Sequence, residues 1–122
     1  MDIETALKEA MEIEGALGAS LVDYGSGMSL GHLGGGKYLD LEVASAGNTE
    51  VVRAKLRTAE ALNLNDSIED ILITLGRQYH IIRLLSNDQG LGLFLYLVLD
   101  RSRANLALAR LTLRRIENDL TI

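Results

Sequence analysis

The 122-residue sequence contains no cysteine and no proline, and it has only two histidines. The absence of cysteine excludes a disulfide framework, a thiolate nucleophile and a cysteine-ligated zinc site. Two histidines also leave few ligands for a transition metal, since histidine supplies most of the remaining ones. We therefore expect a fold that is held together by its apolar core and that uses no metal or other cofactor.

No segment has the composition of a linker, because proline, low-complexity tracts and internal repeats are all missing. Domains commonly contain roughly 100–150 residues, so we expect residues 1–122 to form a single domain. Apolar residues make up 48% of the chain and charged residues 24%, which is the balance of a globular protein and excludes a disordered one.

Acidic residues outnumber basic ones by 17 to 12, so the net charge is −5. Nucleic-acid binding depends on a basic surface, and this balance therefore argues against a nucleic-acid partner. The longest apolar run, Leu91 to Leu99, is far shorter than the roughly 20 residues of a membrane helix. The first four residues, Met1-Asp2-Ile3-Glu4, are acidic where a signal peptide would be basic. We expect a cytoplasmic protein that does not insert into a membrane.

The spacing of apolar residues predicts both helices and strands. Helices are predicted where apolar residues recur every three or four positions, and strands where short apolar or alternating runs lie between turn residues. The helices are predicted over residues 2–14, 48–62 and 102–120, and the strands over 16–23, 28–33, 68–75, 77–85 and 91–99. Residues 38–47 are expected to be an irregular or kinked approach to the middle helix.

The connections between the last three strands determine the predicted topology. Gly76 and residues 87–90 are connections too short for a crossover helix, so the strands that they join should be antiparallel neighbours. The run 91–99 is apolar on both faces, which places it in the middle of a sheet that helices cover on both sides. The predicted order is α-β-β-α-β-β-β-α, an α+β fold with a five-stranded antiparallel sheet.

The two ends of the chain carry opposite charge. Residues 1–14 contain five carboxylates and one lysine, a net charge of −4, whereas residues 101–119 contain five arginines and two carboxylates, a net charge of +3. Opposite charges favour packing of the terminal helices side by side on one face of the sheet. The alternative is that each helix presents an independent solvated face.

The middle helix has a row of small residues at alternating spacings of three and four, which we call the small-residue seam. The seam consists of Ala44, Gly47, Val51, Ala54, Thr58 and Ala61. A second apolar stripe on the same helix consists of Leu41, Val52, Leu56, Ala59 and Leu62. One stripe is enough to seat a helix on a sheet, and small residues let two backbones approach closely, so we favour a seam that packs against another chain. The alternative is one wide stripe on the sheet, with the alanines present for their helix propensity.

Four charged residues lie opposite the seam, and we call them the charged row. Glu50 and Arg53, and likewise Arg57 and Glu60, are spaced for ion pairs on a helix surface. Such a row is usually a solvated face. On a helix displayed by a dimer it becomes a candidate partner-binding surface, because arginine is enriched at interface hot spots.

Residues 31–38 approach the phosphate-loop pattern, in which G-x-x-x-x-G-K is followed by serine or threonine. Tyr38 replaces that small hydroxyl, and the preceding strand is expected to be antiparallel, whereas nucleotide-binding folds use parallel sheets. We therefore expect an ordinary loop here. His32 and His80 have no local nucleophile and orienting partner, so both are expected to be structural. The sequence predicts no catalytic residue and thus no enzyme.

The segment Ile13-Glu14-Gly15-Ala16-Leu17-Gly18-Ala19-Ser20-Leu21-Val22-Asp23, followed by a glycine turn, resembles the opening of the roadblock/dynein light chain family. In that family a short helix leads into glycine, two small residues, an apolar strand, aspartate and a glycine hairpin. Residues 48–62 and 70–86 match the family's middle, and residues 92–113 match its last strand and helix. The resemblance covers essentially the whole chain and is closest to bacterial single-domain members.

This resemblance implies a profilin/longin-like sandwich that dimerises into a continuous sheet. In the family the middle helices lie side by side and the third strands pair edge to edge. Carried to this chain, the paired helix is 44–61 and the paired strand is 68–75, with Ile71 and Ile73 at the interface. The dimer is expected to contain two copies of this chain, or this chain and a paralogue.

The resemblance also implies a function, because family members are platforms for or regulators of Ras-like small GTPases. It implies a non-catalytic homodimeric regulator or scaffold that binds such a GTPase and modulates its GTP hydrolysis. The alternative is a purely structural subunit of a sensor or motor complex. The family has no universal catalytic residue. An effect on hydrolysis would come from repositioning groups of the GTPase, or from Arg53 or Arg57 as an arginine finger.

Overall fold

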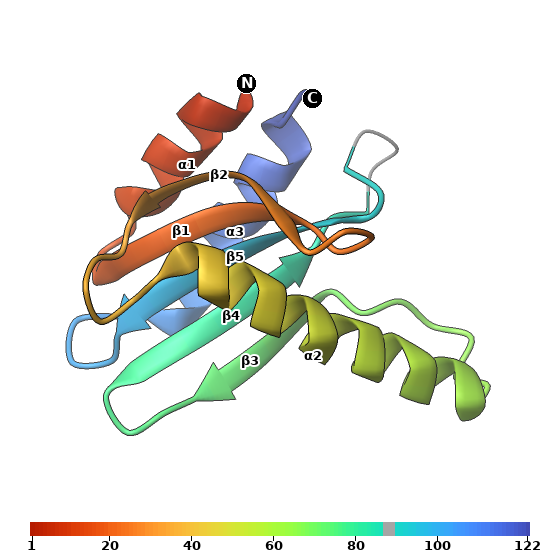
Figure 1. Ribbon diagram of the computed structural model, residues 1–122. Helices are drawn as coiled ribbons and strands as arrows, with labels where there is room; N and C mark the ends of the chain where they lie inside the picture. The colour runs from red at the N-terminus through yellow and green to blue at the C-terminus, as the bar shows by residue number, and fades with distance from the viewer. Residues whose placement is uncertain (87–89) are drawn as a thin grey trace.

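The computed structural model describes residues 1–86 and 90–122, and its elements follow the predicted order (Figure 1). They are α1 (Ile3–Met11), β1 (Ala16–Asp23), β2 (Met28–Gly34), α2 (Leu41–Ala61), β3 (Asp70–Thr74), β4 (Gln78–Leu84), β5 (Leu93–Asp100) and α3 (Leu106–Asp119). The strands form one antiparallel sheet in the order β2-β1-β5-β4-β3. The predicted α+β class and five-stranded sheet are confirmed. The predicted connection 87–90 lies outside the described residues, apart from Gly90.

Strand β5 occupies the centre of the sheet, as its two apolar faces predict. Every residue from Leu93 to Leu99 is buried. The reason is that helices cover both faces, with α1 and α3 on one side and α2 on the other (Figure 1). The outer strands β2 and β3 are left as the two edges of the sheet.

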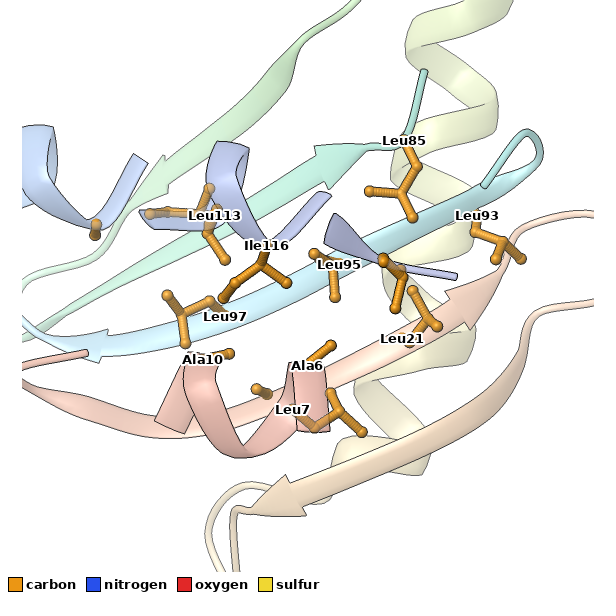
Figure 2. Close-up of a cluster of buried hydrophobic side chains, with 14 of the residues drawn as sticks. Ala6, Leu7, Ala10, Leu21, Leu85, Leu93, Leu95, Leu97, Leu113 and Ile116 are labelled. Carbon is orange, nitrogen blue, oxygen red and sulfur yellow. The ribbon is translucent and has the colours of Figure 1, made fainter. Parts of the chain in front are cut away.

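The larger part of the core lies between the sheet and the two terminal helices (Figure 2). Ala6, Leu7 and Ala10 of α1 and Leu113 and Ile116 of α3 meet a row of sheet leucines. The leucines are Leu21, Leu95 and Leu97. Full burial of each leucine or isoleucine contributes roughly 1.5–3 kcal/mol, so this layer accounts for much of the stability.

The terminal helices lie side by side, which confirms the packing that their charges favour. Arg115 of α3 reaches Glu9 of α1 with 3.4 Å between Nη1 and Oε2. The pair is partly exposed and contributes under about 1 kcal/mol, so it orients the helices more than it stabilises them. The two chain ends are also joined, because the backbone N–H of Thr121 donates to the Met1 carbonyl at 2.7 Å.

Helix α2 is one continuous helix from Leu41, so the expectation of an irregular or kinked approach over residues 38–47 is wrong. The physical reason is an N-cap at Asp40, whose Oδ1 accepts hydrogen bonds from the backbone N–H groups of Glu42 at 3.0 Å and Val43 at 3.1 Å. A cap of this kind stabilises a helix by about 1 kcal/mol, enough to offset one interior glycine. Gly47 is therefore accommodated inside the helix.

Candidate interaction surface

Helix α2 rests on the sheet through a narrow stripe of four buried residues, Leu41, Ser45, Thr49 and Val52. The two hydroxyl groups are satisfied within the helix, since Ser45 Oγ donates to the Leu41 carbonyl at 2.6 Å and Thr49 Oγ1 to the Ser45 carbonyl at 2.7 Å. These short side chains let the helix approach the sheet without a wide apolar face. One stripe is therefore sufficient to hold α2.

The small-residue seam is not part of that buried stripe. Ala44 is half-buried, and the other five seam residues are exposed, with Val51 at 38% of its surface. The alternative of a single wide stripe lying on the sheet is therefore wrong. The seam is a free surface of this chain, and its small side chains would let a second helix pack closely against it.

The fold places the seam beside the sheet edge formed by β3. An open groove of about 530 Å³ runs between α2 and this edge. It is lined by Val51, Ala54, Lys55, Thr58, Ile68, Asp70 and Ile71. Three predicted seam residues and the predicted interface residue Ile71 thus meet in one groove, although they come from separate parts of the sequence. Ile73 follows on the same face of β3 and is half-buried.

Strand β3 pairs only with β4 among the described residues, so its other side carries unpaired backbone N–H and C=O groups. The strand is held at its start by Asp70, whose carboxylate accepts two hydrogen bonds from Arg110 of α3, at 3.0 and 3.1 Å. A bidentate arginine contact has fixed geometry. The edge is therefore held in position from the opposite face of the sheet.

Sequence reasoning missed one residue of this groove, Lys55, because its place there depends on the angle at which α2 crosses the sheet. Ile68 and Asp70 lie within the strand 68–75 that was predicted to pair, although neither was named as an interface residue.

The charged row divides into two parts. Arg53 turns back to the β1–β2 hairpin, where its Nε donates to the Tyr24 carbonyl at 2.9 Å and its Nη2 to the Gly25 carbonyl at 2.6 Å. It also pairs with Glu50 at 3.3 Å, as predicted. With these contacts Arg53 fastens the hairpin to α2, so in this structure its guanidinium is not free to act as an arginine finger.

The other two members of the row remain available at the surface. Arg57 and Glu60 are both exposed, and the predicted ion pair between them is not formed in the described part of the chain. They lie on the C-terminal half of α2, next to the groove residue Thr58. A partner that contacts the groove could therefore reach them.

A hydrogen-bonded polar cluster lies on the α2 face of the sheet. His80 Nδ1 is 2.8 Å from the Tyr96 hydroxyl, and His80 Nε2 is 2.9 Å from Gln78 Oε1. Burial lowers the pKa of His80 below its ordinary value of 6.5 and raises the pKa of Tyr96. The structural role expected for His80 is confirmed. His32, in contrast, is exposed on β2 and has no hydrogen-bond partner among the described residues.

In the segment that approaches the phosphate-loop pattern, residues 31–34 are the end of the antiparallel strand β2, and only residues 35–38 belong to the loop before α2, so the expectation of a loop is confirmed for the second half alone. Its glycines, Gly34, Gly35 and Gly36, all have positive φ. At Gly35 a Cβ atom would lie 2.6 Å from the Leu39 carbonyl oxygen, so only glycine fits this turn. Lys37 is placed over the ring of the exposed Tyr38, 5.4 Å from its centroid.

Two further kinds of site are absent from residues 1–86 and 90–122. No three histidine, aspartate or glutamate side chains there are grouped so that they could hold a metal ion. No helix in the same part of the chain combines the length and the apolar character needed to cross a membrane.

Comparison with known proteins supports the fold. No protein-family model matches the chain, and no curated protein sequence does. The structure is similar to a roadblock/LC7 domain from Streptomyces avermitilis, with a TM-score of 0.80, 11% identity, and coverage of 97% of this chain and 93% of that one. The gliding protein MglB from Thermus thermophilus gives a TM-score of 0.71 at 20% identity, over 95% and 88% of the two chains.

A third similar structure is MglC from Myxococcus xanthus, with a TM-score of 0.59 and 25% identity over 97% of this chain and 95% of that one. The resemblance to the roadblock family is thus confirmed at the level of the fold.

Proposed function

We propose, on the premise that this chain has the roadblock fold, that it is a non-catalytic homodimeric regulator or scaffold that binds a Ras-like small GTPase. The observation that carries the proposal is the open apolar groove between α2 and the β3 edge. The unpaired N–H and C=O groups of β3 can pair with a strand of another chain, and the groove offers that chain apolar contacts, which supports a protein partner.

A second copy of the chain fits this surface. In a twofold dimer the same patch meets itself, so the seam of one α2 would lie against the seam of the other. The two β3 edges would then pair and satisfy each other's free N–H and C=O groups. Small side chains at Gly47, Ala54 and Ala61 would allow the close helix approach that this arrangement requires.

The GTPase would bind to the surface that the two α2 helices display together. Arg57 and Glu60 supply one positive and one negative charge there, and neither is used elsewhere in the described chain. The family resemblance supports a Ras-like small GTPase as the partner class. Because Arg53 is held by the hairpin, an effect on hydrolysis would come from positioning the GTPase's own catalytic groups, or from the exposed Arg57 as an arginine finger.

The test is binding to a Ras-like GTPase from the same organism, loaded with GDP or with a non-hydrolysable GTP analogue. A regulator should bind one nucleotide state at least about tenfold more tightly, because it can shift an equilibrium only by its differential affinity. The hydrolysis rate should change in the same experiment. Equal affinity for the two nucleotide states, with an unchanged rate of GTP hydrolysis, would support the alternative of a purely structural subunit. Absence of binding would overturn the proposal.

Two variants make this test specific to the surface. Arg57→Ala with Glu60→Ala should weaken binding while leaving the dimer intact. Arg114→Ala on the exposed surface of α3 is the matched control and should bind as the unmodified protein does. If Arg114→Ala weakened binding and the α2 variant did not, the GTPase would bind to α3.

A further inference from the structure

Strand β2 forms the sheet edge opposite β3, and it carries none of the charged residues or prolines that commonly protect an edge strand. Its residues, Met28 to Gly34, include no lysine, arginine, aspartate, glutamate or proline. Natural edge strands are commonly guarded by such residues, because a free edge can pair with another strand. An edge strand without such residues is therefore a candidate site for pairing with a strand of a partner protein.

The edge also presents apolar side chains to an incoming strand. Met28 and Leu30 are 66% and 45% exposed. A groove of about 310 Å³ runs between α1 and β2. It is lined by Ile3, Glu4, Leu7, Leu30, Gly31, His32 and Leu33. Side chains of an added strand alternate between the two faces of the sheet, so those on the α1 face would find apolar neighbours in this groove.

The pairing register limits where such a strand can lie. β2 has an extra residue at Leu30, since Leu21 of β1 is opposite Gly31 while Val22 is opposite Ser29. The Ser29 hydroxyl donates to the Gly31 carbonyl at 3.1 Å, which consolidates this bulge. A bulge interrupts the regular ladder at one end, and Gly34 has a positive φ of 74° at the other, so the part of the edge that can accept a strand is Gly31 to Leu33.

The charge beside the edge determines which strand fits. Helix α1 adjoins β2, and residues 1–14 keep a net charge of −4, although Glu4, which lines the groove, pairs with Lys8 at 3.1 Å. We propose that the Gly31–Leu33 edge binds, by strand addition, an extended apolar segment of another protein that carries lysine or arginine. Main-chain hydrogen bonds supply affinity in this mode of recognition, and side chains and charge supply specificity.

A second copy of this chain is a poor occupant of the same edge. Pairing of two β2 strands would bring two α1 segments, each with a net charge of −4, to the same side of the joined sheet. Like charges placed together across an interface oppose association. The β2 edge and the β3 edge are thus expected to take different partners, and the inference at β2 does not rest on the proposed function.

The experiment uses a fluorescein-labelled peptide of alternating valine and threonine with a lysine at each end, and fluorescence anisotropy with the full chain. The peptide should bind, and amide hydrogen exchange at Gly31–Leu33 should slow. A peptide with glutamate in place of lysine should bind at least about tenfold more weakly, because its charges face those of α1. Methylation of alternate peptide nitrogens should abolish binding, because it removes the ladder donors.

Leu30→Lys places a guarding charge on the edge and should weaken binding of the lysine peptide by about tenfold or more. Leu111→Lys is the matched control, since Leu111 is 59% exposed on the outer surface of α3, and it should bind normally. The proposal is overturned if the lysine peptide does not bind, if both peptides bind equally, or if Leu111→Lys weakens binding as much. Assemblies larger than dimers that Leu30→Lys disperses would also overturn it, by showing that the edge takes another copy.

Discussion

The Nε atom of Arg83 on β4 lies 2.8 Å from Oε1 of Glu117 on α3, and both side chains are almost completely buried. The second carboxylate oxygen of Glu117 accepts hydrogen bonds from the backbone N–H of Ser86 at 2.6 Å and from its hydroxyl at 2.9 Å. One carboxylate therefore connects the end of β4 to α3. Since β4 lies beside the edge strand β3, this connection supports the surface assigned to the dimer.

Removal of one partner should destabilise the fold strongly. Glu117→Ala leaves the Arg83 guanidinium buried without its counter-ion, and we expect a loss of roughly 3–5 kcal/mol in the free energy of unfolding. Urea denaturation measures this loss. The control is the double variant Arg83→Met with Glu117→Leu, which removes both charges and should remain within about 1–2 kcal/mol of the unmodified protein. A Glu117→Ala protein as stable as the double variant would contradict the argument.

The same carboxylate should make stability depend on acid pH. Burial raises the pKa of Glu117, but the hydrogen bonds from Ser86 and Arg83 outweigh burial and hold the pKa below its ordinary value of 4.5. The folded state therefore binds the proton less readily than the unfolded state. The stabilisation is complete above pH 4.5 and is lost as the pH falls through the folded-state pKa. Urea denaturation across this range should show a steeper loss for the unmodified protein than for the double variant.

Most of the fold could be predicted from the sequence because its main signals are local. The run Leu91 to Leu99 is apolar on both faces, and that pattern alone places β5 at the centre. The start of α2 could not be placed by apolar periodicity, because Gly47 and the polar residues around it weaken the pattern. The decisive feature there was the cap at Asp40, a single hydrogen-bonding side chain.

The candidate site could be predicted only in part, for a different reason. The seam could be recognised in the sequence because residues three or four positions apart lie on the same face of a helix. The hydrogen bonds of Arg53 to the hairpin could not be predicted from the sequence, because the acceptors, the carbonyls of Tyr24 and Gly25, lie 29 and 28 residues earlier in the chain. Helical spacing places Arg53 beside Glu50, and it contains no information about a hairpin that packs against the same helix.

Arg53 and Arg57 should therefore respond differently to the same substitution. Arg53→Ala removes two hydrogen bonds to hairpin carbonyls, and we expect a loss of about 1–2 kcal/mol, reduced from the full value because the side chain is partly exposed. Hydrogen exchange at Gly25 and Gly27 should accelerate. Arg57→Ala should change neither quantity and should act only on partner binding. Equal stability of the two variants would show that the hairpin contact of Arg53 is unimportant.

His80 should make stability depend on pH in a second range. Burial lowers its pKa below 6.5, so the folded state favours the neutral ring. The stabilisation is complete above pH 6.5 and declines as the pH falls from there through the folded-state pKa. His80→Gln should remove this part of the pH dependence, whereas His32→Gln, at an exposed position, should retain it. Identical pH profiles for the two variants would exclude His80 as the group responsible.

The proposed dimer predicts a specific sensitivity of the seam. Ala54→Arg with Ala61→Arg introduces two charged side chains where two helices would lie in close contact, so the chain should sediment as a monomer or aggregate. Both residues are exposed in the single chain, and the substitutions should therefore leave its own fold intact by circular dichroism.

Ala107→Arg is the control for that variant, because Ala107 is also exposed and lies on α3. It should sediment as a dimer, as the unmodified chain should. If the seam variant remained a dimer, the two copies would have to meet on another surface. If the unmodified chain were a monomer at micromolar concentration, the groove between α2 and β3 would bind a different protein. An apolar groove beside an unpaired strand is a surface to which another chain can bind.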